Sequence, residues 1–217
     1  MTDFAQQRFN MVESQVRPNN VTDPRIAARM HDIPREQFVP KPRRALAYVD
    51  EPVLIADGRY LIPAMQFSKL LQLAGIEADD SVLVVGCGLG YGAAIAAGLA
   101  ESVIAVDEDE ALVAAANDTL ADLGIDNAAV VEGVLSEGMA KQGPYDVIFV
   151  EGAVSEVPQN LLDQLADGGR LVAFLANGTF GKAVIYTKTD GHVGMRQDFD
   201  AVVPPLPGFE KAPEFAL

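Results

Sequence analysis

A glycine-rich segment follows a short apolar run and could hold the nucleoside part of a cofactor. Residues 82–85 are Val-Leu-Val-Val, residues 86–90 are Gly-Cys-Gly-Leu-Gly, and a helical pattern begins at Tyr91. Glycine lets the backbone turn tightly and lets a ligand lie against it. The glycine spacing is G-x-G-x-G. The dinucleotide fingerprint G-x-G-x-x-G would need a glycine where Tyr91 stands, which disfavours a cofactor with a pyrophosphate.

A carboxylate at the end of the next apolar run could bind the ribose of that cofactor. Asp107 follows the run Ser102–Val106 and lies about 20 residues beyond the first glycine, where an acid can accept hydrogen bonds from ribose hydroxyls. Glu108 is a second candidate, and the acidic residues after it are expected to cap the following helix. Cys87 is expected to fill space in the loop, since no histidine that could activate a nucleophile is near it in the sequence.

These candidates are positioned by an alternation of strands and helices that begins at Ser81. Short apolar runs without polar alternation are typical of strands buried on both faces. The alternation predicts an α/β, Rossmann-like fold with a mostly parallel sheet, right-handed crossovers and helices on both faces. The predicted strands are Ser81–Val85, Ser102–Val106, Ala128–Glu132, Asp146–Val150 and Arg170–Leu175, and the helices between them are Tyr91–Leu99, Asp109–Leu123 and Pro158–Leu165. Two later runs, Lys182–Lys188 and Asp198–Val203, flank a turn at Asp190-Gly191 and predict a terminal antiparallel pair.

Residues 1–80 have a different pattern and are interpreted as an N-terminal helical extension. Proline-rich connections separate short amphipathic segments, among them a helix from Pro24 through Met30 that Asp23 caps, and a helix from Ala64 to Leu73. Residues 81–217 are interpreted as the cofactor-binding α/β domain, and the two parts are expected to form one compact unit.

The composition argues against several classes of protein. Hydrophobic residues make up 49% of the 217, enough for a substantial core, and 16 basic against 31 acidic residues leave a net charge of −15. Without a basic cluster, nucleic acid binding by phosphate neutralisation is not expected. One cysteine and two distant histidines argue against a disulfide framework and a metal cluster. No apolar run suits a membrane span or a secretory signal, so the expected location is the cytoplasm, away from membranes.

Ordered motifs occur along almost the whole chain. They are Met11-Val12-Glu13, Val21–Arg25, Ile33–Pro40, Ala47-Tyr48, Pro52–Ile55, Pro144–Val150, Val157–Leu165, Gly168–Val172 and Phe199–Leu206. In this order they resemble the motifs of the protein-L-isoaspartate O-methyltransferases, with the last motif matching the family's final strand. The chain is therefore identified as a divergent member of that family.

The resemblance implies a class I methyltransferase fold with a seven-stranded sheet, S-adenosylmethionine as cofactor and S-adenosylhomocysteine as product. In the family, the free carboxylate of an isoaspartyl residue attacks the sulfonium methyl group, and the ester then closes to a succinimide during protein repair. The substrate is itself the nucleophile, so no catalytic side chain is predicted, and the protein supplies alignment and a dry site. The candidate cofactor-binding residues are Gly86, Cys87, Gly88, Gly90, Tyr91, Asp107, Glu108, Val134 and Leu135.

The substrate loop departs from the family pattern. Family members have a glycine followed by Q-T-I-S-Q/H-P, whereas residues 58–64 here are Gly-Arg-Tyr-Leu-Ile-Pro-Ala. Ile62 stands at the serine and Tyr60 at the threonine, and the lost hydrogen bond to a carboxylate is worth roughly 1.5–3 kcal/mol. Arg59 either compensates by pairing with a carboxylate or lies on the surface. The candidate substrate-loop residues are Gly58, Arg59, Tyr60, Ile62 and Glu151, the last being either part of the crevice or a solvated strand end.

Two cofactor positions also differ from the family. Val84 replaces an acid that commonly precedes the glycine loop, and Val134 replaces the aspartate that usually contacts the adenine amino group. Each lost hydrogen bond would weaken binding by about 10-fold. The sequence thus leaves three functions open: isoaspartyl carboxyl methylation, methyl transfer to another substrate that is small or apolar, and a non-catalytic binding or regulatory role. It predicts no oligomeric state.

Overall fold

The computed structural model describes residues 3–176, 178 and 180–209. Within these residues, seven strands form one sheet in the order β5-β4-β3-β6-β7-β8-β9. Neighbouring strands from β5 to β7 run parallel, and β8 and β9 are added in antiparallel orientation. The strands are β3 (Ser81–Val85), β4 (Ser102–Asp107), β5 (Ala128–Glu132), β6 (Tyr145–Val154), β7 (Leu165–Ala176), β8 (Gly181–Thr189) and β9 (His192–Ala201). The predicted Rossmann-like fold is confirmed.

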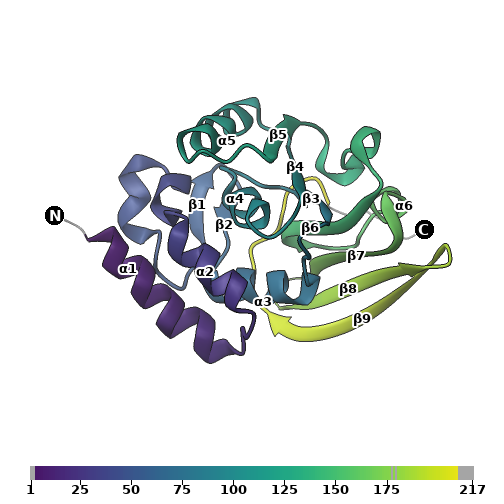
Figure 1. Ribbon diagram of the computed structural model, residues 1–217, viewed down its shortest axis with the longest axis horizontal. Helices are drawn as coiled ribbons and strands as arrows, with labels where there is room; N and C mark the ends of the chain where they lie inside the picture. The colour runs from purple at the N-terminus through teal and green to yellow at the C-terminus, as the bar shows by residue number, and fades with distance from the viewer. Residues whose placement is uncertain (1–2, 177, 179, 210–217) are drawn as a thin grey trace, which may run out of the picture.

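Helices cover both faces of this sheet (Figure 1). Alternate side chains of β3 enter two separate apolar clusters, Val82 and Val84 on one face and Leu83 and Val85 on the other. The first face packs against α3 (Ala64–Ala74), α4 (Tyr91–Ala97) and α5 (Glu110–Asp122), and the second packs against α6 (Gln159–Asp163) and residues 206–209. A strand buried on both faces needs apolar residues at every position, which explains the runs without polar alternation.

The N-terminal segment packs on the first face and shares its apolar cluster. Met11, Val12, Val16, Ile26 and Met30 are all buried in that cluster. The elements are α1 (Phe4–Met11), a π-helical turn (Val12–Val16), α2 (Pro24–Asp32) and 3₁₀ turns at Arg17–Asn19, Arg35–Phe38 and Lys41–Leu46. Figure 1 shows α1 and α2 gathered at one end of the molecule, beside the hairpin β1–β2.

That hairpin was not predicted, because the segment was interpreted only as a loop. Strands β1 (Val53–Ala56) and β2 (Arg59–Leu61) pair in antiparallel orientation and form a small separate sheet. The turn between them is Asp57-Gly58, with Gly58 at a φ of 64°. Asp-Gly between two apolar runs is a strong local signal for a hairpin turn, because glycine adopts positive φ without a steric penalty.

The end of the chain also differs from the prediction. Strand β9 begins at His192 and ends at Ala201, so the predicted strand Asp198–Val203 was placed too late. The motif Phe199–Leu206 was matched to a final strand, and this was wrong for its second half, which lies beyond β9. Pro204 and Pro205 lack the N–H groups that a ladder needs. The chain leaves the sheet there and crosses β6, where Pro205 forms a parallel bridge with Ala153.

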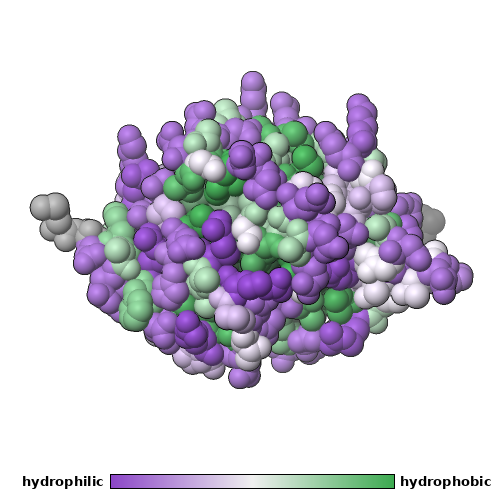
Figure 2. Space-filling model, in the orientation of Figure 1, coloured by the Kyte–Doolittle hydropathy of each residue, from purple (hydrophilic) through white to green (hydrophobic). Residues whose placement is uncertain are grey.

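Strand β6 and helix α6 also have different limits from those predicted. The strand continues to Val154, four residues past the predicted end at Val150, and α6 ends at Asp163 because β7 begins at Leu165. The longer β6 places Glu151 inside a strand. Figure 2 shows hydrophilic side chains over most of the visible face, in line with the composition. Among the described residues, no helix has both the length and the apolar character that a membrane span requires.

Candidate functional site

The candidate site lies at the carboxyl ends of the central strands. Strand β3 has β4 on one side and β6 on the other, so the order of connections reverses at this strand. Open α/β sheets bind ligands in the crevice at such a point. The glycine loop follows β3, Asp107 ends β4, and Glu151 lies in β6. The sheet therefore brings the predicted cofactor acid and a predicted substrate residue to opposite sides of the glycine loop.

The glycine loop has a backbone that only glycine adopts easily. Gly86, Gly88 and Gly90 have φ angles of 77°, 54° and 91°, all in the left-handed region. Gly86 N–H donates to the carbonyl of Val106 on the neighbouring strand at 2.9 Å. Cys87 is buried, and burial raises the pKa of its thiol well above the ordinary value. A thiol with a raised pKa is a poor nucleophile, as expected of a residue that fills space.

Asp107 is fully buried and its carboxylate is surrounded by donors. Oδ1 accepts from Arg59 Nη1 at 2.7 Å and from Asp109 N–H at 3.3 Å. Oδ2 accepts from Arg59 Nη2 at 2.6 Å and from Gly88 N–H at 2.8 Å. The contact with Gly88 ties the acid directly to the glycine loop. The predicted ribose acid is thus next to the loop and already paired with an arginine of the chain.

Arg59 extends from β2 into the interior, and its side chain is 7% exposed. Burial alone would lower the pKa of this guanidinium, but pairing with Asp107 outweighs burial and leaves the pKa above its ordinary value. The arginine therefore stays charged, and the pair is a bidentate buried ion pair. Of the two interpretations of Arg59, the surface position was wrong. The carboxylate it binds is Asp107, the predicted ribose acid of the same chain.

Two apolar side chains lie over the glycine loop, and no local pattern in the sequence predicts either contact. A Cβ built on Gly86 would be 2.7 Å from both methyl carbons of Leu206, and one built on Gly88 would clash with Cδ1 of Ile55. Ile55 belongs to β1, on the same hairpin as Arg59, and Leu206 follows the two prolines after β9. The loop is thus covered from two directions.

A small cavity separates the hairpin from β6. It has a volume of about 10 Å³ and is lined by Gly58, Arg59, Tyr60, Ile62, Glu151, Gly152, Pro204, Pro205 and Leu206. This volume suits about one water molecule and not a side chain of a substrate. All five predicted substrate-loop residues line it, with Ile62 buried and Tyr60 38% exposed.

Glu151 is buried against helix α4, where a Cβ on Gly92 would collide with its carboxyl group. Burial raises the pKa of Glu151 to about 8. The positive charges of Arg59 and Arg35 lower this pKa in part, and the negative charge of Asp107 raises it further. The interpretation of Glu151 as a solvated strand end was wrong. At neutral pH Glu151 is therefore mostly protonated, and a protonated carboxyl group can donate a hydrogen bond into the cavity.

Tyr91 begins α4, but its ring points toward the N-terminal elements. The ring is 5.5 Å from that of Phe38 and 5.3 Å from that of Phe67, and Arg35 lies over it at 4.8 Å. Arg35 donates to the carbonyls of Ala47 and Ile62, and burial lowers its pKa. Arg35 thereby holds the backbone of the substrate loop. Sequence analysis did not single it out.

The remaining candidates lie beside the end of β5. Val134 is 51% exposed, and Leu135 is fully buried in the apolar cluster of the second face. Glu108 is exposed, and its carboxyl oxygen lies 3.7 Å from the position of a Cβ on Gly208. Val134 and Glu108 are therefore accessible, whereas the Leu135 side chain serves the core.

The residues present fit a nucleoside cofactor in their chemistry. The glycine loop offers a backbone that a ligand can approach, and the carboxylate beside it suits the hydroxyls of a ribose. Arg59 occupies this carboxylate, and Ile55 and Leu206 lie over the glycines of the loop.

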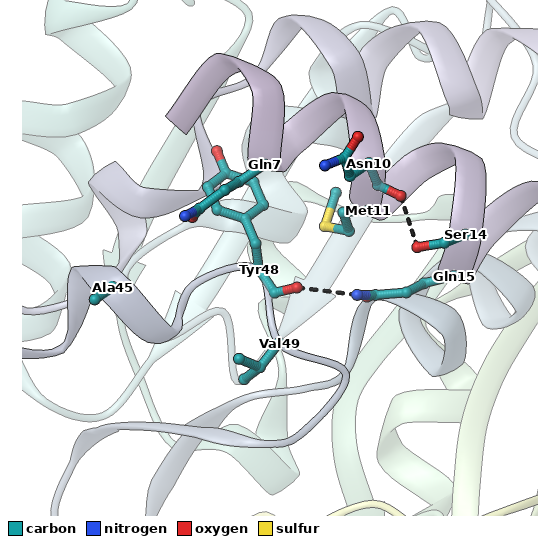
Figure 3. A pocket seen from close by; sticks show the side chains of 8 residues that line it. All are labelled: Gln7, Asn10, Met11, Ser14, Gln15, Ala45, Tyr48 and Val49. Atoms are coloured by element: carbon teal, nitrogen blue, oxygen red, sulfur yellow. Dashed lines mark hydrogen bonds between the residues drawn. The ribbon is translucent and has the colours of Figure 1, made fainter. Parts of the chain in front are cut away.

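A larger pocket lies in the N-terminal segment (Figure 3). It has a volume of about 210 Å³ and lies between α1 with its π-helical turn and the segment 45–49. Gln15 donates to the backbone carbonyl of Tyr48 at 2.9 Å, and Ser14 donates to that of Asn10 at 2.7 Å. None of the predicted site residues lines this pocket.

Comparison with known families and proteins agrees with the geometry. The family model described as protein-L-isoaspartate(D-aspartate) O-methyltransferase matches residues 6–208. A protein-L-isoaspartate O-methyltransferase of Koribacter versatilis is 36% identical over 208 residues, covering 96% of this chain and 94% of the relative. One of Methanoculleus marisnigri is 37% identical over 187 residues, covering 86% of this chain and 85% of the relative.

Two solved structures share the fold at lower sequence identity. A protein-L-isoaspartate O-methyltransferase superposes with a TM-score of 0.80 at 24% identity, covering 93% of this chain and 67% of that one. A Plasmodium falciparum protein described as such a methyltransferase, in complex with S-adenosyl-L-homocysteine, superposes with a TM-score of 0.79 at 21% identity. That match covers 96% of this chain and all of the other.

Proposed function

We propose that this chain, which belongs to the protein-L-isoaspartate(D-aspartate) O-methyltransferase family, methylates the free carboxylate of isoaspartyl residues with S-adenosylmethionine as donor. The family assignment favours this activity over methyl transfer to an unrelated substrate and over a non-catalytic role. We infer that its purpose is protein repair in the cytoplasm, a compartment that keeps a free thiol such as that of Cys87 reduced.

The observation that carries the proposal is the position of two acidic side chains around one glycine loop. Asp107 lies at the β4 side, tied to Gly88 N–H, and Glu151 lies at the β6 side, where it lines the cavity under the hairpin. Because β3 pairs with both β4 and β6, the cofactor side and the substrate side are neighbours. Group transfer needs such a juxtaposition of donor and acceptor.

The residues of the chain contribute binding, orientation and exclusion of water. When bound, S-adenosylmethionine supplies an electrophilic methyl group on a sulfonium. Asp107 would hold the ribose once Arg59 has left it, and the backbone of the glycine loop would lie against the ligand. We call the small cavity between the hairpin and β6 the acceptor cavity. Ile62 and Leu206 make its wall apolar, which favours attack by a carboxylate that has lost its water. Arg59 supplies a cation at the same wall.

The test is methyl transfer to a synthetic peptide that contains one isoaspartyl residue. The purified full chain is incubated with labelled S-adenosylmethionine, and the same peptide with an ordinary aspartyl residue is the control. We expect a base-labile methyl ester on the isoaspartyl peptide alone. Absence of transfer to the isoaspartyl peptide would refute the proposed function, and absence of S-adenosylhomocysteine binding in calorimetry would trace that failure to the cofactor site.

A further inference from the structure

We propose that Arg59 is the receptor for the carboxylate of the substrate and that it exchanges Asp107 for this carboxylate when the cofactor enters. The two ligands would then bind cooperatively, because each favours the position of Arg59 that the other needs. This inference rests on the proposed function, since it takes the substrate to be a carboxylate.

The first argument is that Asp107 has no acceptor capacity left for a ribose. A carboxylate offers about four lone-pair directions, two on each oxygen. Among the described residues, Arg59 Nη1 and Asp109 N–H bind Oδ1, and Arg59 Nη2 and Gly88 N–H bind Oδ2. The two backbone donors are fixed by the fold. Arg59 is therefore the partner that has to leave before ribose hydroxyls can bind.

The second argument is that Arg59 belongs to the same hairpin as part of the cover over the glycine loop. Ile55 on β1 and Arg59 on β2 belong to one short hairpin, and Ile55 lies over Gly88. The turn of the hairpin is exposed at Asp57 and Gly58. A displacement of this hairpin would uncover Gly88 and release Asp107 in one movement.

The third argument concerns the position that Arg59 takes after the exchange. A buried guanidinium without an anion is strongly destabilised, so Arg59 needs a new partner when it leaves Asp107. Its side chain already lines the acceptor cavity with Ile62 and Glu151. Glu151 is the other acid that lines this cavity, and burial raises its pKa to about 8 while Arg59 is paired with Asp107. An isoaspartyl carboxylate that enters the cavity as the hairpin is displaced supplies the missing charge.

The same exchange accounts for the altered substrate loop. Ile62 cannot hydrogen-bond a carboxylate, whereas a guanidinium binds one through two parallel N–H donors. Arg59 would thus supply the recognition that a serine hydroxyl at position 62 would otherwise give. It would also restrict the site to substrates with a free carboxylate, because a neutral ligand would leave Arg59 on Asp107.

The experiment is calorimetric titration of the full chain with S-adenosylhomocysteine, with and without a saturating isoaspartyl peptide. The control peptide has an ordinary aspartyl residue, and the variants are Arg59→Gln and Arg196→Gln. Arg196 pairs with Asp198 on the exposed strand β9 and controls for the loss of one positive charge. Because coupling is reciprocal, the peptide affinity is also measured with and without S-adenosylhomocysteine.

We expect the isoaspartyl peptide to raise the affinity of the wild-type chain for S-adenosylhomocysteine by about 10-fold, within the usual range of such coupling. Arg59→Gln is expected to bind S-adenosylhomocysteine about 10-fold more tightly than wild type without peptide, and to lose the peptide effect. Arg196→Gln should behave as wild type. Should Arg59→Gln fail to fold, Arg59→Lys keeps the charge without bidentate geometry and should give an intermediate affinity and weaker coupling.

Three results would overturn the exchange. They are unchanged S-adenosylhomocysteine affinity in Arg59→Gln, weaker affinity in that variant, or peptide coupling that persists in it. Weaker affinity would mean that Arg59 binds the carboxylate of the cofactor product. A methylated peptide without coupling would refute the exchange and leave the proposed function intact. A peptide that is neither bound nor methylated would refute the proposed function, and with it the isoaspartyl carboxylate as the partner of Arg59.

Discussion

The side chain of Leu206 lies directly over Gly86, so that a Cβ built on the glycine would be 2.7 Å from both methyl carbons of the leucine. Leu206 also lies against Gly152 of β6, where a Cβ would be 2.7 Å from the Cβ of Leu206. One leucine near the end of the chain therefore packs against two glycines at the carboxyl ends of neighbouring strands. Glycine is required at position 86 both by its backbone conformation and by this contact.

The contact predicts a larger loss of stability for Gly86→Ala than backbone strain alone would give. Gly191 is the matched control, because its φ of 76° is almost the same as the 77° of Gly86 and nothing lies within 4 Å of its Cβ position. Both substitutions introduce strain of roughly 1–2 kcal/mol. We expect Gly86→Ala to lose about 1–3 kcal/mol more, as for an overpacked core. Urea unfolding of the two variants measures the difference.

A double substitution checks the cause. In a chain with Leu206→Ala, the space over Gly86 is open, so Gly86→Ala should then lose about as much stability as Gly191→Ala. Equal losses for Gly86→Ala in the presence and absence of Leu206 would contradict the contact and leave backbone strain as the whole effect.

The buried ion pair predicts a large effect for Asp107→Asn. The substitution leaves Arg59 charged, almost unexposed and without its bidentate partner. Breaking a buried pair in this way typically lowers the free energy of unfolding by about 3–5 kcal/mol. Adding Arg59→Met to the same chain should recover part of the loss, because the uncompensated charge is then removed. Denaturant unfolding of the single and double variants tests both statements.

Asp198→Asn is the matched control for that measurement. Asp198 pairs with Arg196, whose side chain is 62% exposed, and pairs of this kind contribute about 0–1 kcal/mol. If Asp107→Asn and Asp198→Asn have the same free energy of unfolding, the Arg59–Asp107 pair contributes no more than a surface contact, and the expectation is wrong.

The central fold could be predicted because its strands are buried on both faces. Residues 82–85 of β3 are all apolar and buried, and the predicted bounds of this strand, 81–85, are the observed ones. The end of the chain could not be predicted in the same way. Residues 192–201 form an edge strand that is exposed on both faces over most of its length, so polar residues dilute the apolar pattern. The prolines after Ala201 turn the chain back across β6.

The site could be predicted only as far as local patterns extend. Asp107 was placed correctly at the crevice, because an acid that ends a buried strand has to lie at the carboxyl edge of the sheet. The partner of Arg59 was left open, because it lies 48 residues away and depends on how the hairpin folds onto the sheet. The contact of Leu206 with Gly86 depends likewise on the path of the chain after Pro205, which no periodicity in the sequence records.

The apolar wall of the acceptor cavity predicts a gain of activity for Ile62→Ser. The side chain of Ile62 is buried and lines the cavity beside Glu151. A serine hydroxyl there could donate to the substrate carboxylate, and a hydrogen bond to a charged group is worth about 1.5–3 kcal/mol. We expect kcat/KM for the isoaspartyl peptide to rise by about 10-fold. Ile62→Ala has the same truncation without the hydroxyl, and equal kcat/KM for the serine and alanine variants would contradict the expectation.

The burial of Glu151 predicts a dependence of stability on pH. Its pKa is about 8 in the folded chain, raised by burial from an ordinary value of 4.5. Between these two values the folded chain retains a proton that the unfolded chain has released. The unfolded state therefore binds fewer protons, and the contribution of Glu151 to stability falls as pH rises. It is fully present below about pH 4.5 and is lost at up to about 1.4 kcal/mol per pH unit as pH increases toward 8.

Glu151→Gln isolates this effect, because glutamine has nearly the shape of the neutral acid and does not titrate. The free energy of unfolding of wild type minus that of Glu151→Gln should decrease steadily between about pH 5 and pH 8 and level off above it. Urea unfolding at constant ionic strength across this range gives the difference. Glu101→Gln, at an exposed position before β4, controls for the loss of one negative charge from an acidic chain. A difference for Glu151→Gln that stays constant from pH 5 to 8 would mean that Glu151 is ionised throughout, and that the acceptor cavity contains an anion beside Arg59.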